Sequence, residues 1–111
     1  MLVTKRVRAI RGAVQVEVNS AEAIAAGTKE LLLEILSANG LTPANVISVL
    51  LTATPDLTAA FPAAAAREVG FEAVPLMCAV EIDVDGALPR IVRAMATVEC
   101  EGDEVSHIYL G

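Results

Sequence analysis

The chain has 111 residues, which fits one domain and leaves no room for two hydrophobic cores. Apolar residues make up 55% and charged residues 20%, a composition that excludes intrinsic disorder and predicts a soluble globular protein. The net charge of −6 argues against nucleic acid or an anionic membrane as a partner. Because the mean hydropathy is +0.60, we expect part of the apolar surface to lie in an interface between subunits.

The first half of the chain predicts a strand, a helix and a short turn. Loose alternation of apolar residues indicates a strand from Arg6 to Val18, bent at Gly12. Apolar residues at helical spacing then predict a helix that is capped by Ser20 and ends at Gly40. Thr42-Pro43 is typical of the cap and first position of one further turn.

The middle of the chain predicts a buried strand, a short helix and an extended segment. The run Val46 to Thr52 is almost wholly apolar, which favours a strand buried on both faces. Ala63 to Val69 indicates a short helix that stops at Gly70, and Ala73 to Ile82 indicates an extended segment.

The last third predicts two strands and completes the fold class. Asp83 to Gly86 is a turn, and Ile91 to Cys100 alternates so regularly that it predicts a strand. Glu101 to Glu104 is interpreted as a hairpin loop, after which Val105 to Leu110 forms the last strand. The order predicts an α+β domain spanning residues 1–111: one mixed sheet of about five strands, with one long and one short helix on one face. We expect the open face to be the oligomer surface.

Several polar residues stand where a core would normally be filled, and each has two interpretations. Arg93, in mid-strand, is either a surface arginine with a buried stem or a fixed guanidinium in a pocket. Glu81 ends an apolar run, either at the surface or as the acid of a site. Arg11 can be a sheet-edge charge, Arg67 a solvent-facing helical residue, and His107 a structural histidine.

Several familiar chemistries have no signature in the sequence. One histidine and two distant cysteines, Cys78 and Cys100, do not have the spacing of a zinc site, and no glycine-rich phosphate loop or nucleophile elbow is visible. We therefore expect no metal and no cofactor, which leaves isomerisation, proton transfer or plain binding. The two cysteines indicate free thiols in a reducing compartment, the cytoplasm. The first residues, Met1 to Arg6, do not have the pattern of a signal peptide.

Four stretches carry a family resemblance when they are taken together and in order: residues 7–13; residues 50–57 with 60–63 and 66–68; residues 74–78 with 81–84; and residues 91–95 with 107–110. They resemble the small monofunctional chorismate mutases of the trimeric, mixed α/β type. The resemblance runs from about Arg8 to Leu110, and it does not extend to the all-helical chorismate mutases. It implies a pseudo-barrel homotrimer that converts chorismate to prephenate in aromatic amino-acid synthesis, without a cofactor, in sites between adjacent subunits.

The resemblance also implies a role for each matching residue. Arg93 matches the arginine aimed at the ether oxygen of chorismate, and Glu81 with Cys78 matches the pair that binds the ring hydroxyl. Arg11 and Tyr109 match residues that hold one substrate carboxylate. Further substrate contacts are implied for Arg67, Phe61, Ala63, Leu76 and Met77. The segment from Phe61 to Arg67 is expected to come from one chain, and Arg93, Glu81 and Cys78 from its neighbour.

The sequence departs from the family pattern at two places, and one other class of protein remains open. Ala64 stands where the family often has a lysine, and this sequence ends at Gly111, where the family usually continues with a short basic tail that closes over the site. The alternative is a trimeric domain that binds small carboxylates or hydrolyses imines. Such a carboxylate-binding domain would not need Glu81 and Cys78 opposite Arg93.

Overall fold

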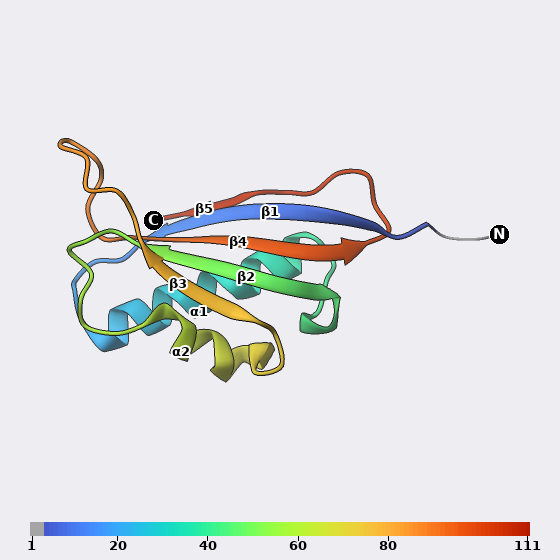
Figure 1. The fold of residues 1–111 in the computed structure, drawn as a ribbon, viewed down its shortest axis with the longest axis horizontal. Coiled ribbons are helices and arrows are strands. Elements are labelled where there is room, and N and C mark those ends of the chain that lie inside the picture. The colour runs from blue at the N-terminus through green and yellow to red at the C-terminus, as the bar shows by residue number, and fades with distance from the viewer. Residues whose placement is uncertain (1–3) are drawn as a thin grey trace.

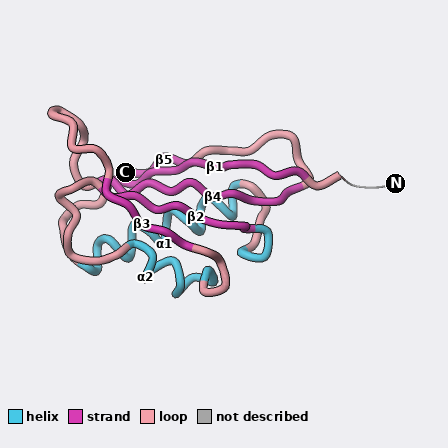
Figure 2. Tube along the Cα trace, viewed as in Figure 1, coloured by secondary structure: helices cyan, strands magenta, loops and turns pink. Residues whose placement is uncertain are grey.

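Within residues 4–111, five strands form one mixed sheet in the order β3-β2-β4-β1-β5, and both helices lie against one of its faces (Figures 1 and 2). The computed structural model describes residues 4–111, so the expectation about the N-terminal signal falls partly outside the described residues. The strands are β1 Arg6–Gln15, β2 Val46–Ala53, β3 Leu76–Val80, β4 Ile91–Cys100 and β5 Ile108–Leu110. The helices are α1 Ala21–Ala38 and α2 Pro62–Ala66. A 3₁₀ turn, Pro43–Asn45, lies between α1 and β2, and a π turn, Arg67–Phe71, directly follows α2. The predicted fold class is confirmed.

The long helix α1 begins and ends where the sequence predicts. The Ser20 hydroxyl accepts the N–H of Ala23 at 3.1 Å, which satisfies one of the free donors of the first turn. Asn39 caps the other end, and Gly40 follows with a φ of 63°, the left-handed conformation that glycine adopts without strain. The helix buries one apolar stripe against the sheet: Ile24, Leu31, Leu32, Ile35 and Leu36.

Strand β4 is the central strand of the sheet. Its residues point alternately to a buried face and to an open face. Its bounds and its alternation agree with the prediction: Val92, Ala94, Ala96 and Val98 are buried against the helices, whereas Arg93, Met95 and Glu99 are exposed on the other face. β1 and β2 both pair with β4 antiparallel, and β3 extends the sheet parallel to β2. Among the described residues, no helix is long and apolar enough to cross a membrane.

Four predicted elements are shorter or shaped differently in the structure. The last strand is Ile108–Leu110 rather than Val105 to Leu110. β1 ends at Gln15 rather than Val18, because Gln15 pairs with Ile91, the first residue of β4. The segment predicted to be extended from Ala73 to Ile82 forms a paired strand only over Leu76–Val80. The expected short helix from Ala63 to Val69 is instead α2 followed by the π turn, in which Gly70 has a φ of 103°.

The prediction that β2 is buried on both faces is wrong for the single chain. Leu51 is fully buried, but its neighbour Leu50 is 41% exposed, because the helices cover only one face of the sheet. The apolar pattern that suggested two-sided burial therefore leaves Leu50, and also Ile47, exposed in the single chain.

The predicted hairpin between β4 and the last strand is also wrong. β5 runs back beside β1 rather than β4, with Tyr109 opposite Ala13 in a parallel register (Figure 1). Both edges of β4 are already paired, with β1 and β2, so the chain pairs with the free edge of β1. Gly12 permits this approach, since a Cβ there would lie 2.9 Å from the carbonyl oxygen of Ile108 and 2.8 Å from Leu31 Cδ1. The glycine marks close packing and not the expected bend.

Candidate active site

A hollow of about 350 Å³ lies on the open face of the sheet and collects side chains from four strands and the end of β3. Its lining residues are Arg11, Gly12, Leu50, Thr52, Glu81, Arg93, Ala94, Met95 and Tyr109. Four of the ten residues predicted for the site lie here: Arg11, Glu81, Arg93 and Tyr109. The sheet order explains this, since β1 stands between β4 and β5 and brings the two ends of the chain together.

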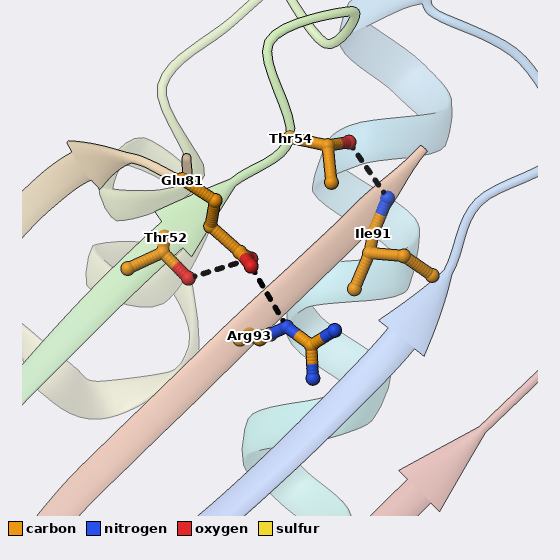
Figure 3. Close-up of polar contacts among 5 residues, drawn as sticks. All are labelled: Thr52, Thr54, Glu81, Ile91 and Arg93. Carbon is orange, nitrogen blue, oxygen red and sulfur yellow. Dashed lines mark hydrogen bonds and ion pairs between the residues drawn. The ribbon is translucent and has the colours of Figure 1, made fainter. Parts of the chain in front are cut away.

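Arg93 and Glu81 form an ion pair at the centre of this hollow. Arg93 Nε donates to Glu81 Oε1 at 2.9 Å, and Figure 3 shows the two terminal guanidinium nitrogens pointing away from Glu81 toward β1. Within residues 4–111 those two nitrogens make no hydrogen bond. The Arg93 side chain is 53% exposed and the Glu81 side chain 21%. The pair therefore presents a cation that is held in place at one nitrogen and open to a ligand at the others.

Thr52 holds the other oxygen of the same carboxylate. Its hydroxyl donates to Glu81 Oε2 at 2.9 Å, and on the strand ladder it stands directly opposite Arg93 (Figure 3). The sequence gives no signal for Thr52, because one threonine in an apolar strand is ordinary. Only the pairing of β2 with β4 shows that its hydroxyl belongs to the site.

The start of β4, two residues before Arg93, is fixed by a polar network. Arg90 has a φ of 56°, which is uncommon for a residue with a side chain. Its backbone N–H donates to Asp56 Oδ2 at 2.9 Å, and the next N–H, of Ile91, donates to the Thr54 hydroxyl at 3.0 Å (Figure 3). A hydrogen bond from Thr54 lowers the pKa of Asp56, and the backbone N–H of Arg90 lowers it further.

Arg11 and Tyr109 bring a second cation and a phenol to the opposite side of the hollow. Both side chains are on the open face and are exposed. The backbone N–H of Arg11 donates to His107 Nδ1 at 3.0 Å, a bond that holds the start of β5 against β1. His107 thus has a structural contact next to the site, as the sequence favoured.

Phe61 and Cys78 line a different hollow, which is mainly apolar and has a volume of about 550 Å³. The structure does not bring the Cys78 thiol to the Glu81 carboxylate, although the resemblance pairs them. Cys78 stands opposite Leu51 on the strand ladder and packs toward the helices, whereas Glu81 bonds Thr52 on the open face. Successive strand residues alternate between faces, so positions three apart point to opposite sides.

The remaining predicted residues lie on α2, the π turn and β3, outside the hollow that Arg93 lines. Ala63 is buried in the core, Leu76 is half-buried, and Arg67 and Met77 are exposed. Phe61, directly before α2, is 76% exposed, an unusual state for a large aromatic side chain. A single chain therefore contains two separate groups of predicted site residues, one mainly polar and one mainly apolar.

The polar group has a definite ligand preference. Two guanidinium groups and a phenol suit a small organic anion with carboxylates, and a carboxylate held at both oxygens can still accept a hydrogen bond from a hydroxyl.

Comparisons with known proteins agree with this chemistry. The family described as chorismate mutase type I matches residues 7–111. Chorismate mutase AroH of Thermus thermophilus is 48% identical over 94% of this chain and 88% of the relative. Chorismate mutase AroH of Bacillus subtilis (strain 168) is 45% identical over 94% of this chain and 84% of the relative.

The chain belongs to the chorismate mutase type I family. A solved structure, a chorismate mutase from Clostridium thermocellum, superposes with a TM-score of 0.87 at 44% identity, over 94% of this chain and 96% of the other. As a chorismate mutase by family, the chain is an isomerase, and the resemblance stated from the sequence is confirmed. Its fold is the mixed α/β one of this family.

Proposed function

We propose that the chain rearranges chorismate to prephenate in the hollow that Arg93 lines, and that this hollow is completed by a neighbouring subunit. The observation that carries the proposal is the Arg93–Glu81 pair, with Nε bonded and the terminal guanidinium nitrogens unbonded among the described residues. The family, shown by sequence and fold, supports the reaction.

The reaction is an intramolecular rearrangement, and the residues act by position and charge. Chorismate has to be held with its enolpyruvyl chain folded over the ring, so that the two carbon atoms that will bond lie close together. The ether C–O bond breaks ahead of C–C bond formation, so negative charge grows on the ether oxygen. A cation already fixed at that oxygen binds the transition state more strongly than the substrate, which lowers the barrier.

Each polar residue of the hollow has one proposed role in that scheme. Arg93 places its terminal nitrogens at the ether oxygen, while Glu81 accepts a hydrogen bond from the ring hydroxyl. Arg11 and Tyr109 hold one carboxylate. These roles use the charge or hydrogen-bonding group of each side chain and its position in the lining of the hollow.

The apolar group would supply the wall that compresses the folded substrate. Phe61 and Cys78 line one hollow, so we assign both to the same half of the site, contributed by the neighbouring chain, with Ala63, Leu76 and Met77 on adjoining elements. Arg67, exposed next to α2, would approach the second carboxylate from that side. This assignment moves Cys78 away from the Glu81 half, with which the resemblance had grouped it.

A homotrimer is the assembly that we propose to join the two halves. Exposed apolar side chains support it, because they lie on the open sheet face around the polar hollow and on the loop between β3 and β4, which projects beyond the sheet (Figure 2). On the sheet they are Val7, Leu50, Met77, Met95 and Tyr109, and on the loop Ile82, Val84 and Leu88.

We also propose a cytoplasmic location, since Cys78 and Cys100 are both free thiols.

One assay and one mass measurement test this proposal. The purified protein, added to chorismate at neutral pH, should remove the chorismate absorbance, and acid treatment should convert the product to phenylpyruvate. Sedimentation under assay conditions should give the mass of three chains. An absence of turnover would contradict the activity, whereas a fully active monomer would contradict the shared site.

A further inference from the structure

Thr52 lies between the two charged residues of the site and bonds only one of them. On the ladder its Cα partners are Arg93 on β4 and Ala79 on β3, and Glu81 follows two residues after Ala79. The backbone N–H of Glu81 donates to the carbonyl of Ala53 at 3.0 Å, which continues the β2–β3 pairing past the end of β3. Thr52 is therefore on the strand that both charged residues flank.

The Glu81 carboxylate is fixed by two different donors, one on each oxygen. The Thr52 hydroxyl donates to Oε2 at 2.9 Å, and Arg93 Nε donates to Oε1 at 2.9 Å. A free carboxylate beside a guanidinium tends to turn until both of its oxygens meet two N–H groups. The Thr52 bond opposes that rotation, because it engages the oxygen that would otherwise reach a terminal nitrogen of Arg93.

We propose that Thr52 is a positioning residue for the rearrangement. Its hydroxyl orients the Glu81 carboxylate so that one lone pair faces the ring hydroxyl of chorismate and the carboxylate does not take up the terminal nitrogens of Arg93. The inference rests on the proposed function of the hollow, and Thr52 itself touches no reacting atom in this scheme. It acts through Glu81.

The main test is Thr52→Val, measured alone and together with Glu81→Ala. Valine keeps the branched shape that suits a strand and removes only the hydroxyl. Thr52→Val should lower kcat/KM for chorismate about tenfold or more, the usual loss for a hydrogen bond to a charged group. In the Glu81→Ala background the same change should lower kcat/KM less than about twofold, because the group on which Thr52 acts is gone.

Two further variants separate positioning from folding. Thr52→Ser retains a hydroxyl and should recover most of the lost kcat/KM. Thr97→Val is the matched control. Thr97 lies on β4 and faces the same open side of the sheet as Arg93. Its hydroxyl makes no hydrogen bond within residues 4–111. It should leave kcat/KM and the trimer unchanged. If Thr52→Val does not fold, Thr52→Ala replaces it in the same cycle.

Three results would overturn the inference: wild-type kcat/KM in Thr52→Val, an equal loss in both backgrounds, or no recovery with serine. A wild-type protein that does not consume chorismate would contradict the proposed function instead. The two failures are therefore distinguishable.

Discussion

The imidazole of His107 accepts the backbone N–H of Arg11 at 3.0 Å, a contact between residues 96 positions apart in the chain. The same two strands carry Arg11 and Tyr109, the two residues proposed to hold one carboxylate of chorismate. β5 pairs with β1 over only three residues, Gly12 to Val14, so this side-chain contact lengthens a short pairing. The placement of β5, and with it Tyr109, is thus stabilised by His107, which is not among the residues that line the hollow.

Replacing His107 should loosen this side of the site. His107→Ala should raise the KM for chorismate and lower the free energy of unfolding by about 0.5–1.5 kcal/mol, the net value of one hydrogen bond. Urea unfolding and steady-state kinetics measure the two effects. His107→Asn is the control, because its amide oxygen occupies nearly the position of Nδ1 and should preserve both values. Equal losses in the two variants would show that the hydrogen bond to the Arg11 N–H is not the cause of the effect.

Gly12→Ala should displace β5. The added Cβ would lie 2.9 Å from the carbonyl oxygen of Ile108, a backbone atom that cannot move without its strand. We expect a loss of about 1–3 kcal/mol in the free energy of unfolding, typical of overpacking, together with a raised KM because Tyr109 moves with Ile108. Thermal unfolding and kinetics of the variant measure both. An unchanged KM at reduced stability would mean that Tyr109 does not contribute to binding.

Arg93 should be the residue whose charge matters most to the chemical step. Arg93→Lys should lower kcat about 10²–10³-fold, because lysine has no Nε that can bond Glu81 while other nitrogens face the substrate. Citrulline at position 93 keeps the shape and removes the charge, and it should also reduce kcat. Arg6→Lys, on the exposed end of β1, is the control and should not change the rate. A citrulline variant with normal kcat and a raised KM would assign Arg93 to substrate binding alone.

The contribution of Asp56 to stability should depend on pH. Its pKa in the folded chain is lowered from 3.8, first by the Thr54 hydrogen bond and then by the Arg90 backbone N–H. Ionised Asp56 therefore stabilises the fold above the unfolded pKa, and this contribution is lost as the pH falls through the folded value. Asp56→Asn should be less stable than the wild type at pH 7, and the difference should shrink below about pH 4. A constant difference across that range would contradict the linkage.

Mixed trimers can test which half of the site contains Cys78. A chain with Arg93→Ala and a chain with Phe61→Ala, unfolded and refolded together, should regain activity, since some interfaces would combine two intact halves. Cys78→Ala placed in the Phe61→Ala chain should leave that regained activity unchanged, because both changes then affect the same half. If it is lost, Cys78 belongs to the half that contains Arg93. Each single variant refolded alone is the baseline.

The sequence predicts those parts of the fold that local patterns determine. β4 was predicted residue for residue, because its alternation is strict over ten residues, and α1 was predicted from its serine cap and closing glycine. The partner of β5 could not be predicted in this way. A loop followed by an apolar segment is equally compatible with a hairpin and with the parallel pairing to β1 that the structure has.

The same limit applies to the site. Arg93 and Glu81 stand out because charges interrupt apolar segments, so they could be found from the sequence. Thr52 could not, since its proposed role depends on the pairing of β2 with β4. Cys78 shows the converse case: a resemblance grouped it with Glu81, and the alternation of β3 places its thiol on the other face of the sheet.

The short pairing of β5 has a consequence for the newly made chain. β1 is synthesised first and β5 last, so during synthesis the outer edge of β1 has no partner, and unpaired edges attract other strands. Even after folding, β5 covers only Gly12 to Val14. The part of β1 that precedes these contacts contains Arg6 and Arg8, and such charges oppose edge-to-edge aggregation. The positive charges near the start of this otherwise acidic protein thus oppose aggregation of β1, the strand whose partner β5 is synthesised last.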